Sequence, residues 1–153
     1  MRTIYALVCL SFAAACGGSS SPPPTTSTNA ATGSPEPTTF AQQVALGQRL
    51  YGENCASCHG TSGEGSGKTP RVVGVNAGAL PLEPPPGAKY RKTQFRTAAD
   101  VADFVVKNMP PQAPGSLKES DYWAILAFDL HANGVDLPAR LDAGQAKTVV
   151  LHK

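Results

Sequence analysis

The feature that most constrains this chain is the run Cys-Ala-Ser-Cys-His at residues 55–59. Its two thiols, Cys55 and Cys58, are one helical turn apart and suitably spaced to add to the two vinyl groups of a haem, with His59 as an axial ligand of the iron. Zinc half-sites, redox dithiols and disulfides use the same cysteine spacing. The adjacent histidine favours haem, because no second cysteine pair or His-x₃₋₅-His follows to complete a zinc tetrad.

Length and composition favour one small domain with extensions. The chain has 153 residues, of which 15 are glycine, 14 are proline and 41% are hydrophobic, so we expect a small core with many loops. A small domain buries little of its own surface and usually needs an additional stabilising group, which a flat apolar haem would supply. The formal net charge of +2 is too close to zero to indicate a nucleic-acid partner.

The first residues are typical of an export signal. An apolar run from Ile4 to Ala15 follows a short basic start and is well below the ~20 residues that a transmembrane helix needs. Residues 1–15 are therefore predicted to be a signal peptide. The small residues before Cys16 resemble the lipobox of bacterial lipoproteins, with Ala13 where leucine is usual, so we expect Cys16 to be lipidated. Ordinary cleavage after Ala15, leaving a free thiol, is the alternative.

Residues 16–39 are rich in serine, threonine and proline and contain almost nothing to bury. Such a composition stays disordered, because it cannot offset the entropy lost on ordering. As a flexible coil it would span about 25–30 Å. We predict a lipid-anchored tether that holds a soluble domain at the periplasmic or cell-surface side of a bacterial membrane.

Capping signals and apolar spacing predict three main helices. Residues 39–42 match a capping box, and apolar residues follow at helical spacing. A second capping signature at residues 97–100 predicts a helix that must stop before Pro110. Ser120-Asp121 can begin the third helix, whose body is apolar, and Asn133-Gly134 supplies a left-handed stop.

Gly47 interrupts the apolar face of the first predicted helix. A glycine there costs roughly 1 kcal/mol relative to alanine, so we interpret it as a point where another helix approaches closely. The expected partner is the last strong helix. In that helix Trp123 and Phe128 are predicted to be ordinary core residues.

Paired terminal helices, a Cys-x-x-Cys-His run at the end of the first helix and a later Met-Pro resemble class I cytochrome c. The nearest resemblance is to small bacterial c-type domains found alone or fused to oxidases and dehydrogenases. It covers about residues 40–134, and the pattern Gly-x₃-aromatic before C-x-x-C-H-G is matched by Gly47, Tyr51 and residues 55–60. It implies an all-α class I cytochrome c fold, with three to five helices wrapped around one covalently bound haem c and its iron.

The resemblance also sets the domain boundaries that we predict. The cytochrome c domain occupies residues 40–135, after the signal peptide and the tether. Residues 136–153 form a C-terminal extension. Its apolar run at residues 148–151 predicts a strand-like strip whose position on the domain is open.

The family pattern implies His59 and Met109 as axial ligands of the iron. Met109 lies 50 residues after His59, precedes two prolines and is the sole methionine after the leader. The resemblance further implies that Pro70 presents its carbonyl to the proximal histidine, which would fix the ring and raise its basicity. An ordinary loop proline is the alternative. His131 and His152 are rival ligands, for which we expect surface positions.

One basic cluster has two competing interpretations. It is either a solvated loop or a patch that faces the haem propionates or an acidic redox partner. Residue spacing alone does not separate the two. The cluster consists of Lys89, Arg91, Lys92 and Arg96.

Iron held by both His59 and Met109 has no open coordination position. The implied function is therefore electron transfer rather than catalysis, through an iron that changes between Fe(III) and Fe(II) without changing ligands. The expected partners are redox proteins outside the cytoplasm, met in small and transient contacts. Alternatives are a haem peroxidase or gas sensor in which Met109 is displaced, or a fixed cytochrome c subunit of a larger oxidase or dehydrogenase.

Overall fold

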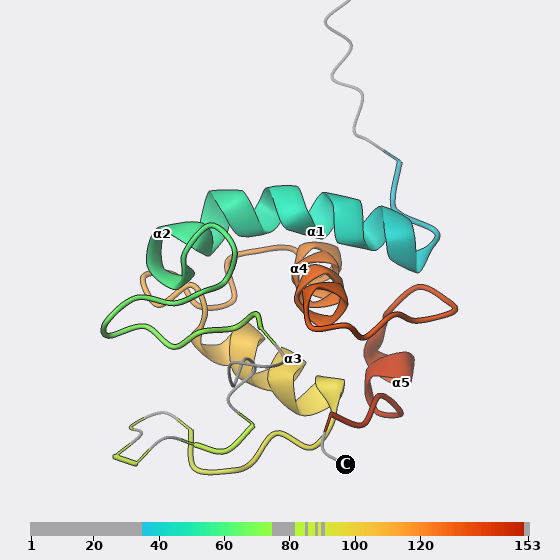
Figure 1. Cartoon of the computed structure of the whole chain (residues 1–153). Coiled ribbons are helices and arrows are strands. Elements are labelled where there is room, and N and C mark those ends of the chain that lie inside the picture. The colour runs from blue at the N-terminus through green and yellow to red at the C-terminus, as the bar shows by residue number, and fades with distance from the viewer. Residues whose placement is uncertain (1–34, 75–81, 85, 88, 90, 152–153) are drawn as a thin grey trace, which may run out of the picture. The chain divides into compact units, whose positions relative to one another are not determined.

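The computed structural model describes residues 35–74, 82–84, 86–87, 89 and 91–151 (Figure 1). Its helices are α1 (Phe40–Asn54), α2 (Ala56–His59), α3 (Ala98–Asn108), α4 (Glu119–Ala132) and α5 (Ala143–Ala146). The described ranges contain two isolated β-bridges and no longer strand, which confirms the predicted all-α fold. In the same ranges, no helix has the length and apolarity needed to cross a bilayer. The predicted signal peptide, Cys16, most of the tether and His152 lie outside the described residues.

The helices α1 and α3 begin at the two capping boxes predicted from the sequence. The hydroxyl of Thr39 accepts a hydrogen bond from the N–H of Gln42, and the Gln42 side chain accepts one from the N–H of Thr39. At α3 the Asp100 carboxylate accepts hydrogen bonds from the N–H groups of Thr97 and Arg96, which lower the pKa of Asp100. These contacts satisfy backbone donors that a helix start leaves unpaired.

The helix α4 begins one residue earlier than predicted. It starts at Glu119, and its N-cap, Lys118, makes no side-chain capping bond, so Ser120 and Asp121 belong to the first turn. Two acidic residues in that turn, Glu119 and Asp121, favour this start because they complement the positive end of the helix dipole. At the other end Gly134, with φ of +78°, provides the predicted left-handed stop.

The helix α1 lies across α4, and the two backbones touch at Gly47 (Figure 1). A Cβ atom built on Gly47 would lie 1.9 Å from the carbonyl oxygen of Ala124 and 3.0 Å from the Cβ of Phe128. The close approach predicted at Gly47 is therefore confirmed. One turn further along α1, the ring of Tyr51 packs against Phe128, with 5.2 Å between ring centroids.

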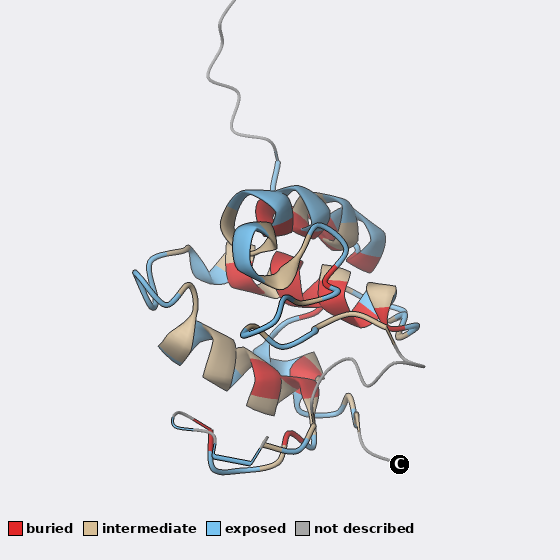
Figure 2. Cartoon of the chain, turned by 60° about the vertical axis from the view of Figure 1, so that its left-hand side comes forward, coloured by how far each residue is buried: buried red, intermediate tan, exposed pale blue. Residues whose placement is uncertain are grey.

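Two hydrophobic clusters share α4, and Figure 2 shows the buried residues of the helices on the sides that face one another. The smaller cluster joins the second half of α1 to α4, and the larger one joins α4 to the start of α1, α3, α5 and the chain end. Trp123 and Phe128 pack against these clusters as partly buried residues, as predicted for core positions. The buried members of the smaller cluster are Leu50, Tyr51, Ala124 and Ile125, and those of the larger one are Phe40, Phe95, Ala98, Val101, Leu126, Ala127, Leu130, Leu141 and Ala146.

The predicted C-terminal extension packs against the helices through one buried side chain of α1. The Gln43 amide is fully buried, donates from Nε2 to the carbonyl of Leu141 at 2.9 Å and accepts from the N–H of Leu141 at 2.6 Å. These two bonds satisfy both the N–H and the C=O of Leu141, which is itself fully buried. Gln43 therefore fixes the extension to the cytochrome domain.

The apolar run near the chain end pairs with the segment that precedes α3. Thr97 and Val150 form an antiparallel bridge. On either side of it, Ala98 donates to the carbonyl of Val149 at 3.0 Å, and Leu151 donates to the carbonyl of Arg96 at 2.9 Å. The predicted strand-like strip is thus a single bridge beside the start of α3.

Replacing Gly47 tests the helix contact. Alanine is favoured in a helix by roughly 1 kcal/mol over glycine, but we expect Gly47→Ala to lower the free energy of unfolding by about 3 kcal/mol or more, because its Cβ overlaps the backbone of Ala124. Denaturant unfolding measures the change. Gly52→Ala is the matched control, because nothing lies within 4 Å of its Cβ, and it should be neutral or slightly stabilising. Equal effects of the two substitutions would contradict the close approach.

Replacing Gln43 tests the attachment of the extension. In Gln43→Ala the N–H and C=O of Leu141 lose their partners, and each unsatisfied buried group costs about 1–3 kcal/mol. We expect a loss of roughly 2–5 kcal/mol in denaturant unfolding and faster hydrogen exchange at the Leu141 amide. Arg49→Ala, at an exposed position of the same helix, should change the stability by less than about 0.5 kcal/mol. Unchanged protection of Leu141 would refute the role of Gln43.

Candidate haem site

A single cavity of ≈ 410 Å³ collects the cofactor-binding residues predicted from the sequence. Its wall includes apolar side chains of α3 and α4, among them Val101, Phe104 and Ile125. The predicted site residues come from segments far apart in the chain, and all of those within the described ranges meet here. They are Cys55, Cys58, His59, Pro70 and Met109.

The thiol pair lies where α1 gives way to α2. The N–H groups of Cys58 and His59 both donate to the carbonyl of Cys55, at 3.1 and 2.9 Å, so the segment closes one helical turn. Cys55 is partly buried and Cys58 is exposed, and both are free thiols. The turn therefore presents two thiols and an imidazole to one cavity.

The electrostatics around Cys55 do not suit a redox dithiol. Burial raises the pKa of its thiol to about 12, with smaller contributions from the charges of Asp129 and Cys58. A nucleophilic cysteine in a catalytic dithiol has a lowered pKa instead. Among the residues with described positions, no group of three or more His, Cys, Asp or Glu side chains is arranged to hold a metal ion.

The loop after α2 orients the His59 ring through a hydrogen bond to its Nδ1 atom. His59 Nδ1 lies 2.9 Å from the carbonyl oxygen of Pro70, and a protonated Nδ1 donates to it. In this tautomer Nε2 has a free lone pair, and Nε2 is therefore the atom that a metal would bind. The loop is folded back by the bond from the N–H of Gly65 to the carbonyl of His59 and by the bond from the Ser66 hydroxyl to the carbonyl of Cys58.

Two helices fix the backbone at Met109 on the cavity wall. Met109 follows α3 directly, and its N–H donates to the carbonyl of Val105 at 2.8 Å. The hydroxyl of Tyr122, on α4, donates to the carbonyl of Met109 at 2.8 Å. The predicted end of α3 before Pro110 is confirmed.

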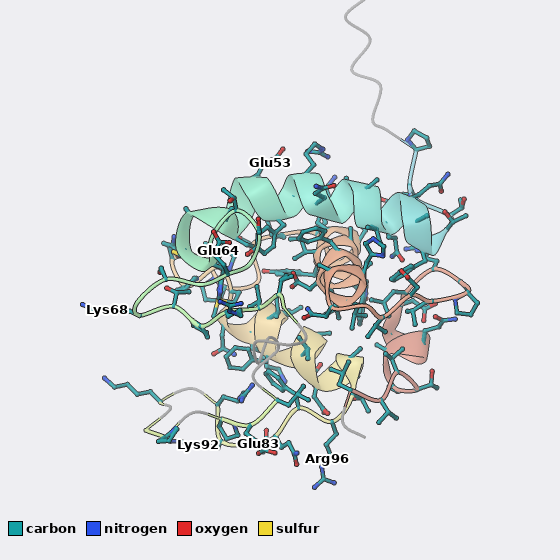
Figure 3. All side chains as sticks on the ribbon, in the orientation of Figure 1. Glu53, Glu64, Lys68, Glu83, Lys92 and Arg96 are labelled. Carbon is teal, nitrogen blue, oxygen red and sulfur yellow. The ribbon has the colours of Figure 1, made fainter. Side chains whose placement is uncertain are left out.

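The basic cluster divides into two kinds of residue. Arg91 is only 7% exposed, its guanidinium carbon lies 4.0 Å from the ring centroid of Phe95, and it lines the cavity with Lys89. Lys92 and Arg96 are exposed and are not part of the cavity wall, and Figure 3 shows Arg96 pointing outward. Neither of the two interpretations therefore applies to the whole cluster. Of the four residues in the basic cluster, only Lys89 and Arg91 place positive charge on the cavity wall.

Asp129 is a cavity residue that our sequence reasoning missed. It is 9% exposed on α4, and its Oδ1 atom has no hydrogen-bond partner. Burial raises the pKa of this carboxyl to about 8. Its charge in turn raises the pKa values of Tyr51 and Cys55, for which burial is the larger cause. The available signal was one acidic residue inside the apolar run at 123–130, which we interpreted only as helix body.

The rival axial ligand His131 lies elsewhere. Its ring is exposed at the end of α4 and pairs with the carboxylate of Asp136. It is not among the residues that line the cavity, so the surface position expected for it is confirmed.

The residues around the cavity fit an iron porphyrin. Apolar walls suit the flat macrocycle, two thiols one turn apart match its vinyl groups, and an imidazole and a thioether are available as ligands. Lys89 and Arg91 place positive charge on the cavity wall, as the two propionates of a haem would require. When bound, the haem supplies reversible one-electron chemistry, which no side chain of this cavity provides.

Comparisons with known proteins agree with this fit. The sequence pattern of the family described as "Cytochrome C oxidase, cbb3-type, subunit III" matches residues 42–128. Thiosulfate dehydrogenase of Stutzerimonas stutzeri (strain A1501) is 31% identical over 91 residues, which are 56% of this chain and 26% of that protein.

A solved structure is also similar. The sulfane dehydrogenase SoxCD from Paracoccus pantotrophus matches with a TM-score of 0.53 and 33% identity, over 71% of this chain and 52% of that chain. The chain thus spans about a quarter of the dehydrogenase sequence and about half of the SoxCD chain.

The family match covers more than half of the chain and includes the thiol pair, the adjacent histidine and Met109. The helical fold and the cavity described above are those expected of such a protein. The chain therefore belongs to the family of the cbb3-type cytochrome c oxidase subunit III, and it is a class I c-type cytochrome with covalently bound haem c and its iron.

Proposed function

We propose that this cytochrome is a single-electron carrier and not itself an enzyme. In this proposal Cys55 and Cys58 form the thioether links, and His59 and Met109 bind the iron on its two faces. The observation that carries it is that these four side chains, from segments 50 residues apart, line one apolar cavity. With both axial positions filled the site favours electron transfer, and the methionine ligand favours a high potential.

The surrounding residues have distinct roles in this proposal. The carbonyl of Pro70 orients His59 and increases the basicity of its ring, as a second contact to a ligating histidine commonly does. Arg91, buried against Phe95, and Lys89 neutralise propionate charge, so that the carboxylates are not left unpaired beside an apolar wall.

We further propose that the protein is exported and held at a membrane by lipid on Cys16. The apolar leader, the small residues before that cysteine and the Ser/Thr/Pro-rich segment after it support this proposal. The domain would then exchange electrons at the periplasmic or cell-surface side of the membrane.

For the redox partner we propose a protein that oxidises an inorganic sulfur compound. The support is the similarity to a thiosulfate dehydrogenase and to a sulfane dehydrogenase. The cytochrome would accept single electrons from such a partner, either as a free carrier or as a fixed subunit. Free carriers make small, short-lived contacts, whereas a fixed subunit would co-purify with the dehydrogenase.

A spectrum and a mass test the central proposal. Protein made together with a cytochrome c maturation system should carry the added mass of one haem and show a reversible change of the haem absorption bands on reduction. The oxidised protein should also show the near-infrared charge-transfer band of methionine bound to Fe(III). A polypeptide without added mass at its thiols would refute the proposal.

Met109→Ala tests the distal ligand. We expect loss of the near-infrared band, binding of carbon monoxide to the reduced protein, and a potential lower by on the order of 100 mV, within the roughly 0.8 V range that axial ligands set. Gln112→Ala, another residue of the cavity wall, is the control and should retain the band and the potential. Retention of both in Met109→Ala would show that a different residue is the ligand.

Tyr122→Phe tests how α4 positions the distal ligand. It removes the hydroxyl that donates to the Met109 carbonyl, which costs about 1–3 kcal/mol and therefore raises the equilibrium constant for methionine dissociation roughly tenfold. The near-infrared band is lost when the methionine dissociates. A tenfold larger dissociation constant should therefore lower the pH at which the band disappears by about one unit.

Tyr51→Phe is the matched control for Tyr122→Phe. It removes a hydroxyl that donates to the carbonyl of Gly60, on the proximal side, and should leave the pH at which the band disappears unchanged. The same shift in both variants would mean that general destabilisation, and not the contact to Met109, is responsible.

A further inference from the structure

We propose that Asp129 is a proton-binding site coupled to electron transfer. Its carboxylate takes up a proton from solvent when the cytochrome accepts an electron, and it releases that proton when the electron leaves. The protein would thus carry one electron and, over part of the pH range, one proton. This inference rests on the proposed function, because it requires a haem in the cavity that Asp129 lines.

The position of Asp129 is unusual for an acidic side chain. It is nine-tenths buried on α4, the helix that supplies more buried apolar residues than any other described helix, and it lies one turn after Ile125 on the cavity wall. Its Oδ1 atom has no hydrogen-bond partner. A buried carboxylate oxygen without a partner makes the ionised form costly, so the group favours the neutral acid and binds a proton strongly.

The groups around Asp129 do not offset this cost. From α1, the Tyr51 hydroxyl interacts electrostatically with Asp129 but donates its hydrogen bond to the carbonyl of Gly60. Cys55, which follows α1, also interacts with Asp129, and its sulfur would be an uncharged thioether once haem is attached. From the following loop, Glu64 adds negative charge near Tyr51. Burial is the cause that raises the pKa of Asp129 to about 8.

Further charged groups near this site lie on α3 and elsewhere on the cavity wall. On α3, Asp103 and Lys107 form an exposed pair with each other, and Asp100 caps its own helix. The titratable or charged side chains that share the cavity wall with Asp129 are Cys58, His59, Lys68, Lys89 and Arg91.

Electrostatics couples this proton to the electron. Oxidation of a haem bound in this cavity would add one positive charge, which would favour the ionised form of Asp129, and reduction would remove that charge. At an effective dielectric constant of about 20, two unit charges about 10 Å apart change proton affinity roughly tenfold. The carboxyl therefore holds its proton more tightly in the reduced protein than in the oxidised protein.

Charge balance is complete without a further reactant. The electron comes from the reduced redox partner and the proton from solvent. On reduction the haem gains one negative charge and Asp129 gains one positive charge, so that the net charge of the buried site is unchanged. Both steps reverse when an oxidised partner takes the electron.

The midpoint potential of the haem-loaded protein, measured against pH from 5 to 10, tests the coupling. In the wild type we expect the potential to fall with rising pH across a window by about 59 mV in total, which is the tenfold difference in proton affinity converted for one electron. Asp129→Asn should flatten this window and should raise the potential most at its alkaline end. Asp129→Glu keeps a titratable group and should retain a slope.

Asp103→Asn is the matched control, because Asp103 is an exposed carboxylate on α3 whose removal should leave the profile unchanged. A change of potential by the same amount at every pH in Asp129→Asn would indicate a merely structural role and would overturn the proposal. A retained slope in that variant would overturn it too, and would assign the proton to another group, such as a propionate.

A second measurement uses only the wild-type protein and therefore does not depend on whether a variant folds. The reduced-minus-oxidised infrared difference spectrum of the wild type, recorded at a pH within the window, should contain the carbonyl band of a carboxylic acid that is protonated on reduction and shifts in D₂O. Absence of this band would overturn the coupling. A reversible one-electron titration with a flat pH profile would refute only the role of Asp129 and would agree with electron transfer. Protein that carries no haem would refute the proposed function itself.

Discussion

The contact on which this structure depends is the crossing of α1 and α4 at Gly47. Because residue 47 has no side chain, the backbone of α1 comes close enough to touch the carbonyl of Ala124. Every larger residue would hold the helices further apart. The apolar residues on both sides of the crossing then pack into one cluster, and Tyr51 reaches Phe128. This close contact therefore sets the position of α1 relative to α4.

That crossing sets the geometry of the haem site. The thiols and His59 follow the end of α1, while α4 supplies Asp129 and, through the hydroxyl of Tyr122, a contact to the backbone of Met109. A shift of α1 along α4 would move the proximal residues relative to the distal one. The proposed ligands would come from both sides of a flat cofactor and would tolerate little such movement, which is a reason for a glycine here despite its cost in a helix.

Local signals in the sequence predicted the parts of this fold that are determined locally. Capping boxes at Thr39 and Thr97 and the stop at Gly134 depend on neighbours within four residues, and all three are present. The roles of Gln43 and Arg91 depend on partners far along the chain or on burial. Spacing could not separate Arg91 from Lys92, because which of two adjacent side chains faces the cavity is decided by how the loop packs.

Asp129 shows why a polar residue in an apolar helix face deserves a functional interpretation. Its carboxyl is protonated in the folded chain up to a pH of about 8 but ionised in the unfolded chain above about 4, so the free energy of unfolding falls as the pH rises between these values. A leucine at this position would avoid that loss. A buried carboxyl, by contrast, responds to the charge of the cavity that it lines. If that charge changes by one unit between two redox states, the cost of ionising the carboxyl differs between them, and so does its proton affinity.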